Sequence, residues 1–282
     1  MAWSHNLPVD LVLVRHGESE GNIYDKMSAD GKRRKLHSRH TSDYRLTDLG
    51  RLQARRAGMI VREEIGSFDR MYCSEYVRAV ETAGHMSLPE SQFQTASEIR
   101  EIQAGMERGM QESPGLSQHN ASLRRLRGGG WWTPHKGVGG ESFADLTHRL
   151  RQFLHHLQES AAGLRVLVVC HAHAIRAFRA LLEDVKAPDF QSLLDWRIPN
   201  CHIRWYTRRE SLGTIHIRPH KVIELNMKMP LSFEQTDASL ERSEYLICRP
   251  LLTVEQLLAR AEAVPQILNS ADLRADGKRS SL

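Results

Sequence analysis

The chain has 282 residues, of which 40% are hydrophobic and 26% charged, a balance typical of globular rather than disordered proteins. This length suffices for one large α/β domain with a sizeable core, or for two small domains. No apolar run approaches the roughly 18–20 residues of a membrane-spanning helix, and the first ten residues lack the basic segment and apolar core of a signal peptide. We therefore expect a cytosolic protein with no membrane partner.

The net charge of +5, from 39 basic and 34 acidic residues, is a mild basic excess. Basic residues cluster at Lys32–Lys35 and Leu123–Arg127, but aromatic residues make up only 6% of the chain and are not interleaved with these clusters. Nucleic-acid binding is therefore weakly supported, and a small anionic substrate explains a basic site equally well. The four cysteines show no C-x-x-C spacing, which predicts reduced thiols without a zinc site or disulfide framework.

The unbroken apolar run Leu11–Val14 predicts a strand that is buried on both faces of a mainly parallel sheet. Arg15, His16 and Gly17 follow it directly, at the carboxyl end of the strand, where open α/β sheets bind their ligands. Gly17 permits a sharp turn or a close approach to a ligand. A planar cation beside a nitrogen nucleophile indicates a site for a phosphoryl group, although three residues alone are equally compatible with a structural role.

The next predicted elements repeat this arrangement of a strand followed by polar residues. A helix with Thr47 as its N-cap runs to about Glu64. A second strand, Ser67–Cys73, leads into another helix, and Arg78 lies near the start of that helix. Arg78 therefore also stands near the carboxyl end of a strand.

Two stretches predict a cap over the site. Residues 25–45 are polar and basic, and residues 104–140 are long, rich in glycine and irregular, as in many substrate caps. Within the second stretch, Trp131 and Trp132 either stack on a substrate ring or pin the loop to the core. The segment Ser97–Ile102 leads into this loop and contains Glu101.

The second half of the chain begins with an amphipathic helix over Glu141–Glu159. A strongly apolar strand, Leu164–Val169, then ends at Cys170 and His171 and precedes a helix from about Ala174 to Glu183. Parallel strands bring their carboxyl ends to one edge of a sheet, so the two strand-end histidines and two arginines can converge on one pocket. Two histidines, two arginines and an acid are the groups that phosphoryl transfer through a phosphohistidine requires.

The remaining chain predicts weaker elements. Three short runs after Asn200 predict edge strands, over Cys201–Thr207, Gly213–Arg218 and Val222–Leu225. We therefore expect a catalytic domain over residues 1–229. Residues 230–282 form a C-terminal extension with one helix, Val254–Ala263, and a disordered tail.

The segment R-H-G-E-S-E-G-N, from Arg15 to Asn22, resembles the signature of the histidine phosphatase superfamily, phosphoglycerate-mutase-like branch. Further segments match the family in order, and they are Leu46–Ala54, Ser74–Ala83, Gly140–Phe143 and Val168–Arg176. The resemblance covers roughly Val9 to Asn200. It implies an α/β fold, a three-layer α/β/α sandwich with a mostly parallel central sheet.

The resemblance also implies roles for individual residues. His16 would be the nucleophile that becomes phosphorylated, and Arg15, Arg78 and His171 would form the phosphate pocket. Asn22 would be a further contact. No metal and no cofactor would be needed. His16 must be unprotonated on its attacking nitrogen, whereas the arginines keep the anion bound across neutral pH.

Glu101, in I-R-E-I-Q-A-G, aligns with the proton donor of the family, although it is equally compatible with an exposed loop carboxylate. As a donor it would need a raised pKa, which a desolvating cap can supply. The chain has His171-Ala172-His173 where many members have His-Gly-Gly or His-Gly-Asn. The Ala172 N–H can still donate to phosphate, and His173 either contacts the substrate or points to solvent.

These observations favour a metal-independent phosphatase that hydrolyses a small phosphomonoester through phospho-His16. Ile175-Arg176 is phosphatase-like, and the region after Glu101 lacks the Tyr-Gly-x-Leu-Gln-Gly-Leu-Asn-Lys run of the mutases. The alternatives are a phosphoglycerate-type mutase that needs a bisphosphate primer, and a catalytically weak binding or scaffold protein. The oligomeric state stays open, a homodimer included.

Overall fold

The computed structural model describes residues 6–24, 39–88, 91–103, 140–185, 189–209, 217–225 and 251–275. Their strands form one seven-stranded sheet in the order β6-β5-β1-β4-β2-β3-β7. The strands in the middle run parallel, and they are β1 (Asp10–Arg15), β4 (Arg165–Cys170), β2 (Arg70–Ser74) and β3 (Gln92–Ala96). The outer strands run antiparallel to their neighbours, and they are β5 (Ile203–Thr207), β6 (Arg218–Ile223) and β7 (Leu251–Thr253).

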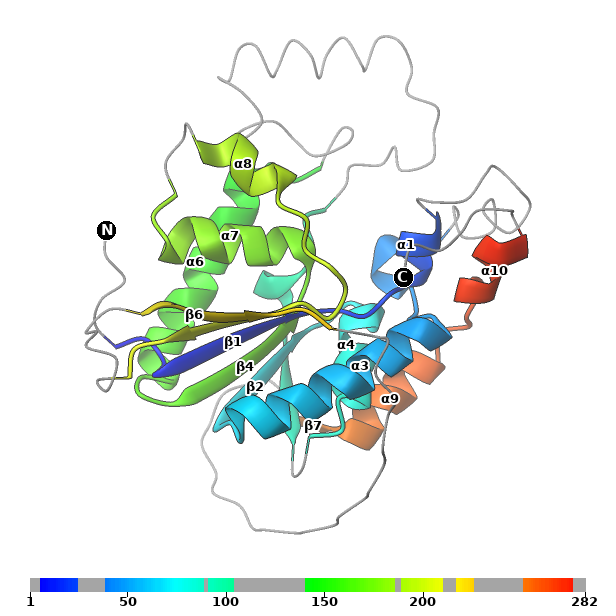
Figure 1. Ribbon diagram of the computed structural model, residues 1–282, viewed down its shortest axis with the longest axis horizontal. Coiled ribbons are helices and arrows are strands. Elements are labelled where there is room, and N and C mark those ends of the chain that lie inside the picture. Colours follow the sequence, from blue (N-terminus) through cyan, green and yellow to red (C-terminus); the bar gives the residue numbers. More distant parts are fainter. Residues whose placement is uncertain are drawn as a thin grey trace, which may run out of the picture.

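Helices cover both faces of this sheet (Figure 1). One face carries α6 (Phe143–Ser160), α7 (Ala172–Leu182) and α8 (Phe190–Asp195). The other face carries α3 (Asp48–Ile60), α4 (Val77–His85) and α9 (Val254–Glu262). Two short helices, α1 (Glu20–Tyr24) and α10 (Ser270–Ala275), lie beyond the carboxyl end of β1. The predicted three-layer sandwich with a mostly parallel sheet is confirmed.

The apolar run in β1 is continuous because both of its faces are covered. Leu11 and Leu13 belong to the core cluster under α6 and α7, whereas Val12 and Val14 belong to the cluster under α3 and α4. All four side chains are fully buried. Strand β1 is thereby held in the middle of the molecule, and the residues after it emerge at a defined place.

The helices begin close to where the sequence predicts. The Thr47 hydroxyl caps α3 by accepting from the Gly50 N–H (3.0 Å), and the helix continues as a π-helical turn, Val61–Ile65. Helix α6 starts with a capping box between Ser142 and Asp145. Helix α7 begins at Ala172, two residues earlier than predicted, so it starts immediately after His171.

Several elements differ from the predictions at the edges of the sheet. Strands β3 and β7 and helix α8 were not predicted, because each is short and has no run of apolar residues long enough to stand out. The segment Cys201–Thr207 was predicted as an edge strand, but β6 lies outside β5, so β5 is an inner strand. Strand β6 spans Arg218–Ile223 and overlaps the start of the predicted run Val222–Leu225. Most of the other predicted run, Gly213–Arg218, lies outside the described residues.

The described part of the C-terminal extension is built into the same fold. Strand β7 pairs with β3, and α9, which was predicted over Val254–Ala263, packs against α4 and buries Leu257 and Ala261. Most of the two predicted cap segments, 25–45 and 104–140, lies outside the described residues, namely residues 25–38 and 104–139 with both basic clusters and the tryptophan pair. The predicted disordered tail lies outside them as well.

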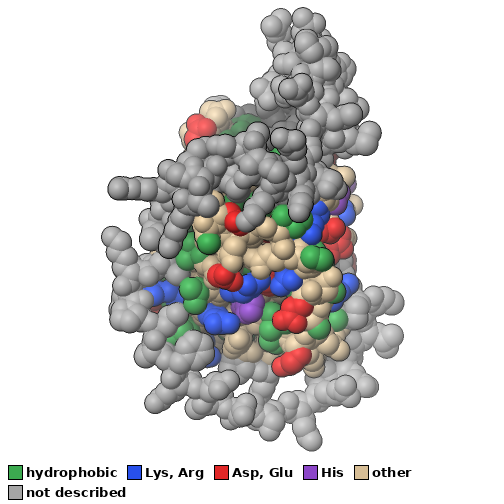
Figure 2. All heavy atoms as spheres, turned by 90° about the vertical axis from the view of Figure 1, so that its right-hand side faces the viewer, with side chains coloured by type: hydrophobic (Ala, Val, Ile, Leu, Met, Phe, Trp, Pro, Cys, Tyr) green, Lys and Arg blue, Asp and Glu red, His purple; other side chains and the backbone are tan. Residues whose placement is uncertain are grey.

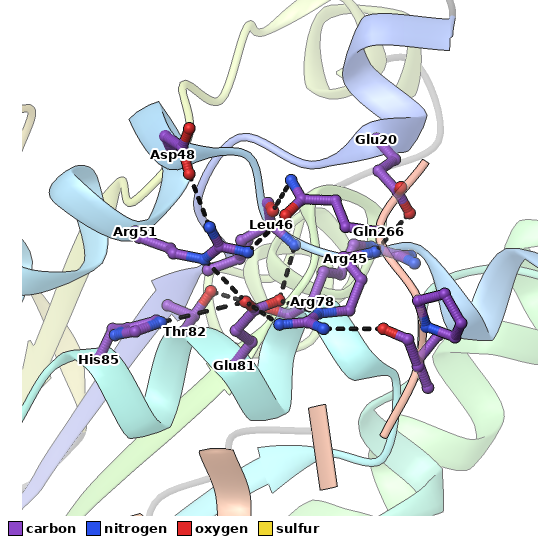
Figure 3. A network of polar contacts seen from close by, with 12 residues as sticks. Glu20, Arg45, Leu46, Asp48, Arg51, Arg78, Glu81, Thr82, His85 and Gln266 are labelled. Carbon is purple, nitrogen blue, oxygen red and sulfur yellow. Dashed lines mark hydrogen bonds and ion pairs between the residues drawn. The ribbon is translucent and has the colours of Figure 1, made fainter. Parts of the chain in front are cut away.

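A buried carboxylate joins α4 to the start of α3 and to the C-terminal segment (Figure 3). Glu81 accepts hydrogen bonds from Arg45 (2.9 and 3.1 Å), from Arg51 Nε (3.1 Å) and from the Leu46 N–H (2.8 Å). Arg45 also donates to the Val264 carbonyl (2.7 Å). Burial alone would raise the pKa of Glu81, but these hydrogen bonds lower it, so the group stays ionised. Figure 2 shows one face of the molecule, on which basic and acidic side chains lie among one another.

Two glycines let the loop after β1 contact the first turn of α3. A Cβ on Gly17 would lie 2.4 Å from the Gly50 carbonyl oxygen, and a Cβ on Gly50 would lie 2.0 Å from the Glu18 carbonyl oxygen. Gly17 is therefore needed for the close approach of two backbones. The sequence suggested a sharp turn or an approach to a ligand, and the structure shows this packing constraint instead.

We expect Gly50→Ala to lower the free energy of unfolding by about 1–3 kcal/mol, because the methyl group meets backbone atoms that cannot move aside. The effect opposes the better helix propensity of alanine. Gly84→Ala, on α4, is the matched control, since its nearest neighbour is the flexible side chain of Leu258. Urea unfolding measures both, and a Gly50→Ala protein as stable as the control would contradict this packing argument.

Candidate active site

The site lies where β1, β4 and β2 end. His16 follows β1 and His171 follows β4, and the two rings are 5.2 Å apart between centroids. The backbone N–H of His16 donates to the Cys170 carbonyl (3.0 Å), which extends the pairing of β1 with β4 by one residue. Arg78, on α4 after β2, donates from Nε to His16 Nε2 (3.3 Å). The predicted convergence of two strand-end histidines and an arginine is therefore present.

The surroundings of His16 select one tautomer. Its Nδ1 lies 2.7 Å from the Gly17 carbonyl oxygen, which can only accept, so Nδ1 carries the hydrogen. Burial lowers the pKa of His16 well below 6.5, and the charges of Arg78 and Arg15 lower it further. At neutral pH the ring is therefore neutral, and the electron pair on Nε2 accepts the hydrogen bond from Arg78 Nε.

Two arginines flank this nitrogen. Burial lowers the pKa of Arg15 to about 10, so the group remains a cation at neutral pH. Arg15 donates from Nη1 to the Ile198 carbonyl, and its buried Nε has no partner among the described residues. Arg78 donates from Nη1 to the Thr41 carbonyl (2.6 Å), and its guanidinium lies over the Tyr76 ring, 4.9 Å from the centroid. Two fixed cations beside a neutral nucleophile suit a tetrahedral dianion.

His171 is fully buried on the other side of His16. Its Nε2 lies 2.8 Å from Ser74 Oγ, at the end of β2, and its ring packs against Tyr76 with centroids 5.3 Å apart. Burial and the charge of Arg78 lower the pKa of His171 well below 6.5. Its Nδ1 has no hydrogen-bond partner among the described residues, so this nitrogen is available to a ligand.

Sequence reasoning missed Ser74 and Tyr76 as site residues. Ser74 has the same position as His16 and His171, at or directly after the end of a parallel strand, so the strand-end criterion could have found it. Tyr76 carries no such signal, because its role depends on packing between Arg78 and His171. Its ring contacts both groups and so links the two sides of the pocket.

Glu101 follows β3 and a 3-10 turn, η3 (Ser97–Ile99), and lies beside the first turn of α7. Its Oε1 is 3.3 Å from His173 Nδ1, and its Oε2 is 3.5 Å from the His173 backbone N. Burial alone would raise the pKa of Glu101, but His173, His171 and Arg78 together bring it well below 4.5. The pKa of Glu101 is thus lowered in this structure, whereas a proton donor would need a raised one.

His173, for which the sequence left substrate contact and solvent exposure open, contacts Glu101. Ala172 is the first residue of α7, so its N–H belongs to the helix N-terminus beside His171. Asn22 accepts on Oδ1 from the Ser19 N–H (3.1 Å) and from Asn200 Nδ2 (3.1 Å). Asn200 also donates to the His16 carbonyl (3.1 Å), so the contacts of Asn22 hold the loop that carries His16.

Comparison with known proteins agrees with this arrangement. The family model described as "Histidine phosphatase superfamily (branch 1)" matches residues 11–217, and the chain belongs to this superfamily. The sequence is 30% identical over 190 residues to a 2,3-bisphosphoglycerate-dependent phosphoglycerate mutase of Rhizobium etli, covering 64% of this chain and 82% of that protein. It is 28% identical over 186 residues to a 6-phosphofructo-2-kinase/fructose-2,6-bisphosphatase of Caenorhabditis elegans, covering 64% of this chain and 35% of that protein.

The fold is also similar to solved structures of the same architecture. Phosphoserine phosphatase from Entamoeba histolytica, in complex with 3-phosphoglyceric acid, superposes with a TM-score of 0.56 at 20% sequence identity. The superposition covers 77% of this chain and 97% of that chain. At this identity the likeness establishes the fold alone.

Replacing Tyr76 tests whether its ring positions Arg78 and His171. Tyr76→Phe keeps the ring, and we expect it to bind inorganic phosphate as the unaltered protein does. Tyr76→Leu removes the cation–π contact, and we expect binding weaker by about 2- to 30-fold, the equivalent of ~0.5–2 kcal/mol. Calorimetric titration with phosphate measures both, and equal affinities of the Phe and Leu variants would show that the ring is not needed.

Proposed function

We propose that this protein is a metal-independent phosphatase that hydrolyses a phosphomonoester through a phosphohistidine on His16. The observation that carries the proposal is the state of the His16 ring. Its Nε2 keeps an electron pair at neutral pH, at the meeting point of three strand ends and beside the half-buried Arg15 and the buried Arg78. The small phosphorylated substrate supplies the negative charge that these arginines are placed to hold.

In the first step, His16 Nε2 attacks phosphorus and the bond between phosphorus and the ester oxygen breaks. Arg15, Arg78 and His171 hold the charge of the equatorial oxygens, with Ala172 N–H and Asn22 as proposed further contacts. Glu101 gives its proton to the leaving oxygen. Glu101 is ionised in the unliganded protein, but a bound dianion cancels the positive charges around it and so raises its pKa toward the protonated form.

In the second step, the Glu101 carboxylate takes a proton from a water molecule, and the water oxygen attacks phosphorus. The bond between phosphorus and His16 Nε2 breaks and the electron pair returns to the ring. Inorganic phosphate leaves, and His16 is again neutral. The two steps need no redox change and no group beyond those of the chain and water.

A phosphoglycerate-type mutase is the second candidate, and the similarity to the Rhizobium etli mutase favours it. The sequence after Glu101 lacks the run that the mutases carry there, which favours hydrolysis. A mutase would depend on a bisphosphate primer to keep His16 phosphorylated. A weak binding or scaffold protein is less well supported, because His16, Arg15, Arg78 and His171 are all intact.

The test is phosphate release from a panel of phosphomonoesters in the presence of a chelator. We expect turnover by the unaltered protein and a loss of at least ~10³-fold in His16→Ala, because the nucleophile is removed. His155→Ala, at an exposed histidine on α6, is the matched control and should keep full activity. Turnover only after addition of a bisphosphate would favour the mutase, and no turnover on any ester would overturn the proposal.

Two further expectations concern the surroundings of the protein. Among the residues that the structure describes, no helix is long and apolar enough to cross a membrane. The cytosolic location and the oligomeric state, a homodimer included, stay predictions. Size-exclusion chromatography with light scattering measures the latter directly.

A further inference from the structure

The carboxylate of Glu101 is fixed from two sides. The His173 imidazole and the His173 backbone N–H approach its two oxygens, at 3.3 Å from Oε1 and 3.5 Å from Oε2. The Ile102 N–H donates to Oε1 at 2.9 Å. The carboxylate therefore sits at the N-terminus of α7, where the helix dipole favours a negative charge.

His173 differs from the other two histidines of the site in its access to solvent. The side chain of His173 is 27% exposed and that of Glu101 is 19% exposed. His16, by contrast, is 3% exposed and His171 is fully buried. His173 as a whole therefore reaches solvent, whereas its Nδ1, which faces Glu101, is itself buried.

The surroundings of the Glu101–His173 pair are strongly positive. The charged and titratable groups that face it come from β1, β4, α4, α6, α7, the turn before α4 and the residue after β4. They are Arg15, Tyr76, Arg78, Arg149, Cys170, His171 and Arg176. These cations favour the ionised form of Glu101. An ionised Glu101 carries no proton of its own, so it cannot act as the donor without a source of one.

On the basis of the proposed function, we propose that His173 is a positioning residue that shares one proton with Glu101 and supplies it for the leaving group. A bound phosphoryl dianion lowers the positive potential, and the proton moves from His173 Nδ1 to Glu101 Oε1. Glu101 then passes it to the ester oxygen as the bond to phosphorus breaks. The pair is left as a neutral imidazole beside a carboxylate.

The second half of the reaction restores the pair. The Glu101 carboxylate takes a proton from the attacking water and returns it to His173 Nδ1, as the bond between phosphorus and His16 breaks. The pair thus lends one proton and recovers one in each cycle, without an outside acid. An ionised Glu101 in the free protein and a proton-donating Glu101 in the reaction are then compatible.

The experiment compares ester substrates whose leaving groups differ in their need for a proton. The leaving group of p-nitrophenyl phosphate departs as a stable anion, whereas that of an alkyl phosphate must be protonated. We expect His173→Asn to lower kcat/KM for the alkyl ester by about 10- to 100-fold, within the 10²–10⁴-fold range of general acid catalysis. The loss of kcat/KM for the p-nitrophenyl ester should be below about 3-fold, because its leaving group needs no proton. This ester therefore reports only on how well the other groups of the site are positioned.

A second readout is the pH profile of kcat on the alkyl ester. In the unaltered protein the imidazole holds the proton, and in His173→Asn the carboxyl group must hold it alone. Because a carboxyl group loses its proton at lower pH than an imidazole, we expect the basic limb of the profile to move to lower pH. Combining His173→Asn with Glu101→Gln should add little to the loss caused by Glu101→Gln alone, since both act on one proton.

His173→Gln serves as a second variant, and His155→Asn, on the exposed face of α6, as the matched control. Equal losses on both esters in both His173 variants would show a structural role and overturn this inference. So would an unchanged alkyl-ester rate with an unchanged pH profile. These outcomes leave the proposed function standing, whereas absence of turnover by the unaltered protein on both esters would overturn the proposed function and this inference together.

Discussion

The hydrogen bond from His16 Nδ1 to the Gly17 carbonyl, 2.7 Å long, decides what the rest of the site can do. It commits the ring hydrogen to one nitrogen and leaves the electron pair on the other, beside Arg78. Burial and two neighbouring cations keep the ring from taking up a second proton. In the proposed reaction, the nucleophile and the groups that bind charge are therefore arranged before a substrate arrives, which keeps the reorganisation small.

The fold holds the backbone on both sides of the His16–Gly17 hydrogen bond in place. Strand β1 is buried on both faces, and the Gly17–Gly50 contact holds the turn after it against α3. The C-terminal segment, which lies outside the residues matched by the family model, also contacts the loop after β1. The Leu268 N–H donates to Glu20 (2.9 Å), and Ser270 Oγ donates to Glu18 (2.9 Å). The signature segment is thus supported by parts of the chain that are distant in sequence.

The sequence predicted β1, β4 and β2, most of the helices that cover them and the meeting of His16, His171, Arg15 and Arg78, because apolar runs and strand-end polar residues are local signals. Strands β3 and β7 lack such runs and owe their place to pairing with neighbours. Tyr76 and the charge state of Glu101 depend on side chains from several elements, so no local pattern could predict them. The pKa of Glu101 shows this most clearly, since burial and nearby cations act in opposite directions.

The most direct test of the account is to trap the covalent intermediate. Rapid quenching of the protein with a phosphomonoester, followed by peptide mass spectrometry under conditions that preserve phosphohistidine, locates the phosphoryl group. The account predicts an acid-labile phosphate on His16, formed and consumed at rates compatible with turnover and absent from His16→Ala. Steady turnover with no phosphorylated His16, or with the phosphoryl group on another residue, would contradict it.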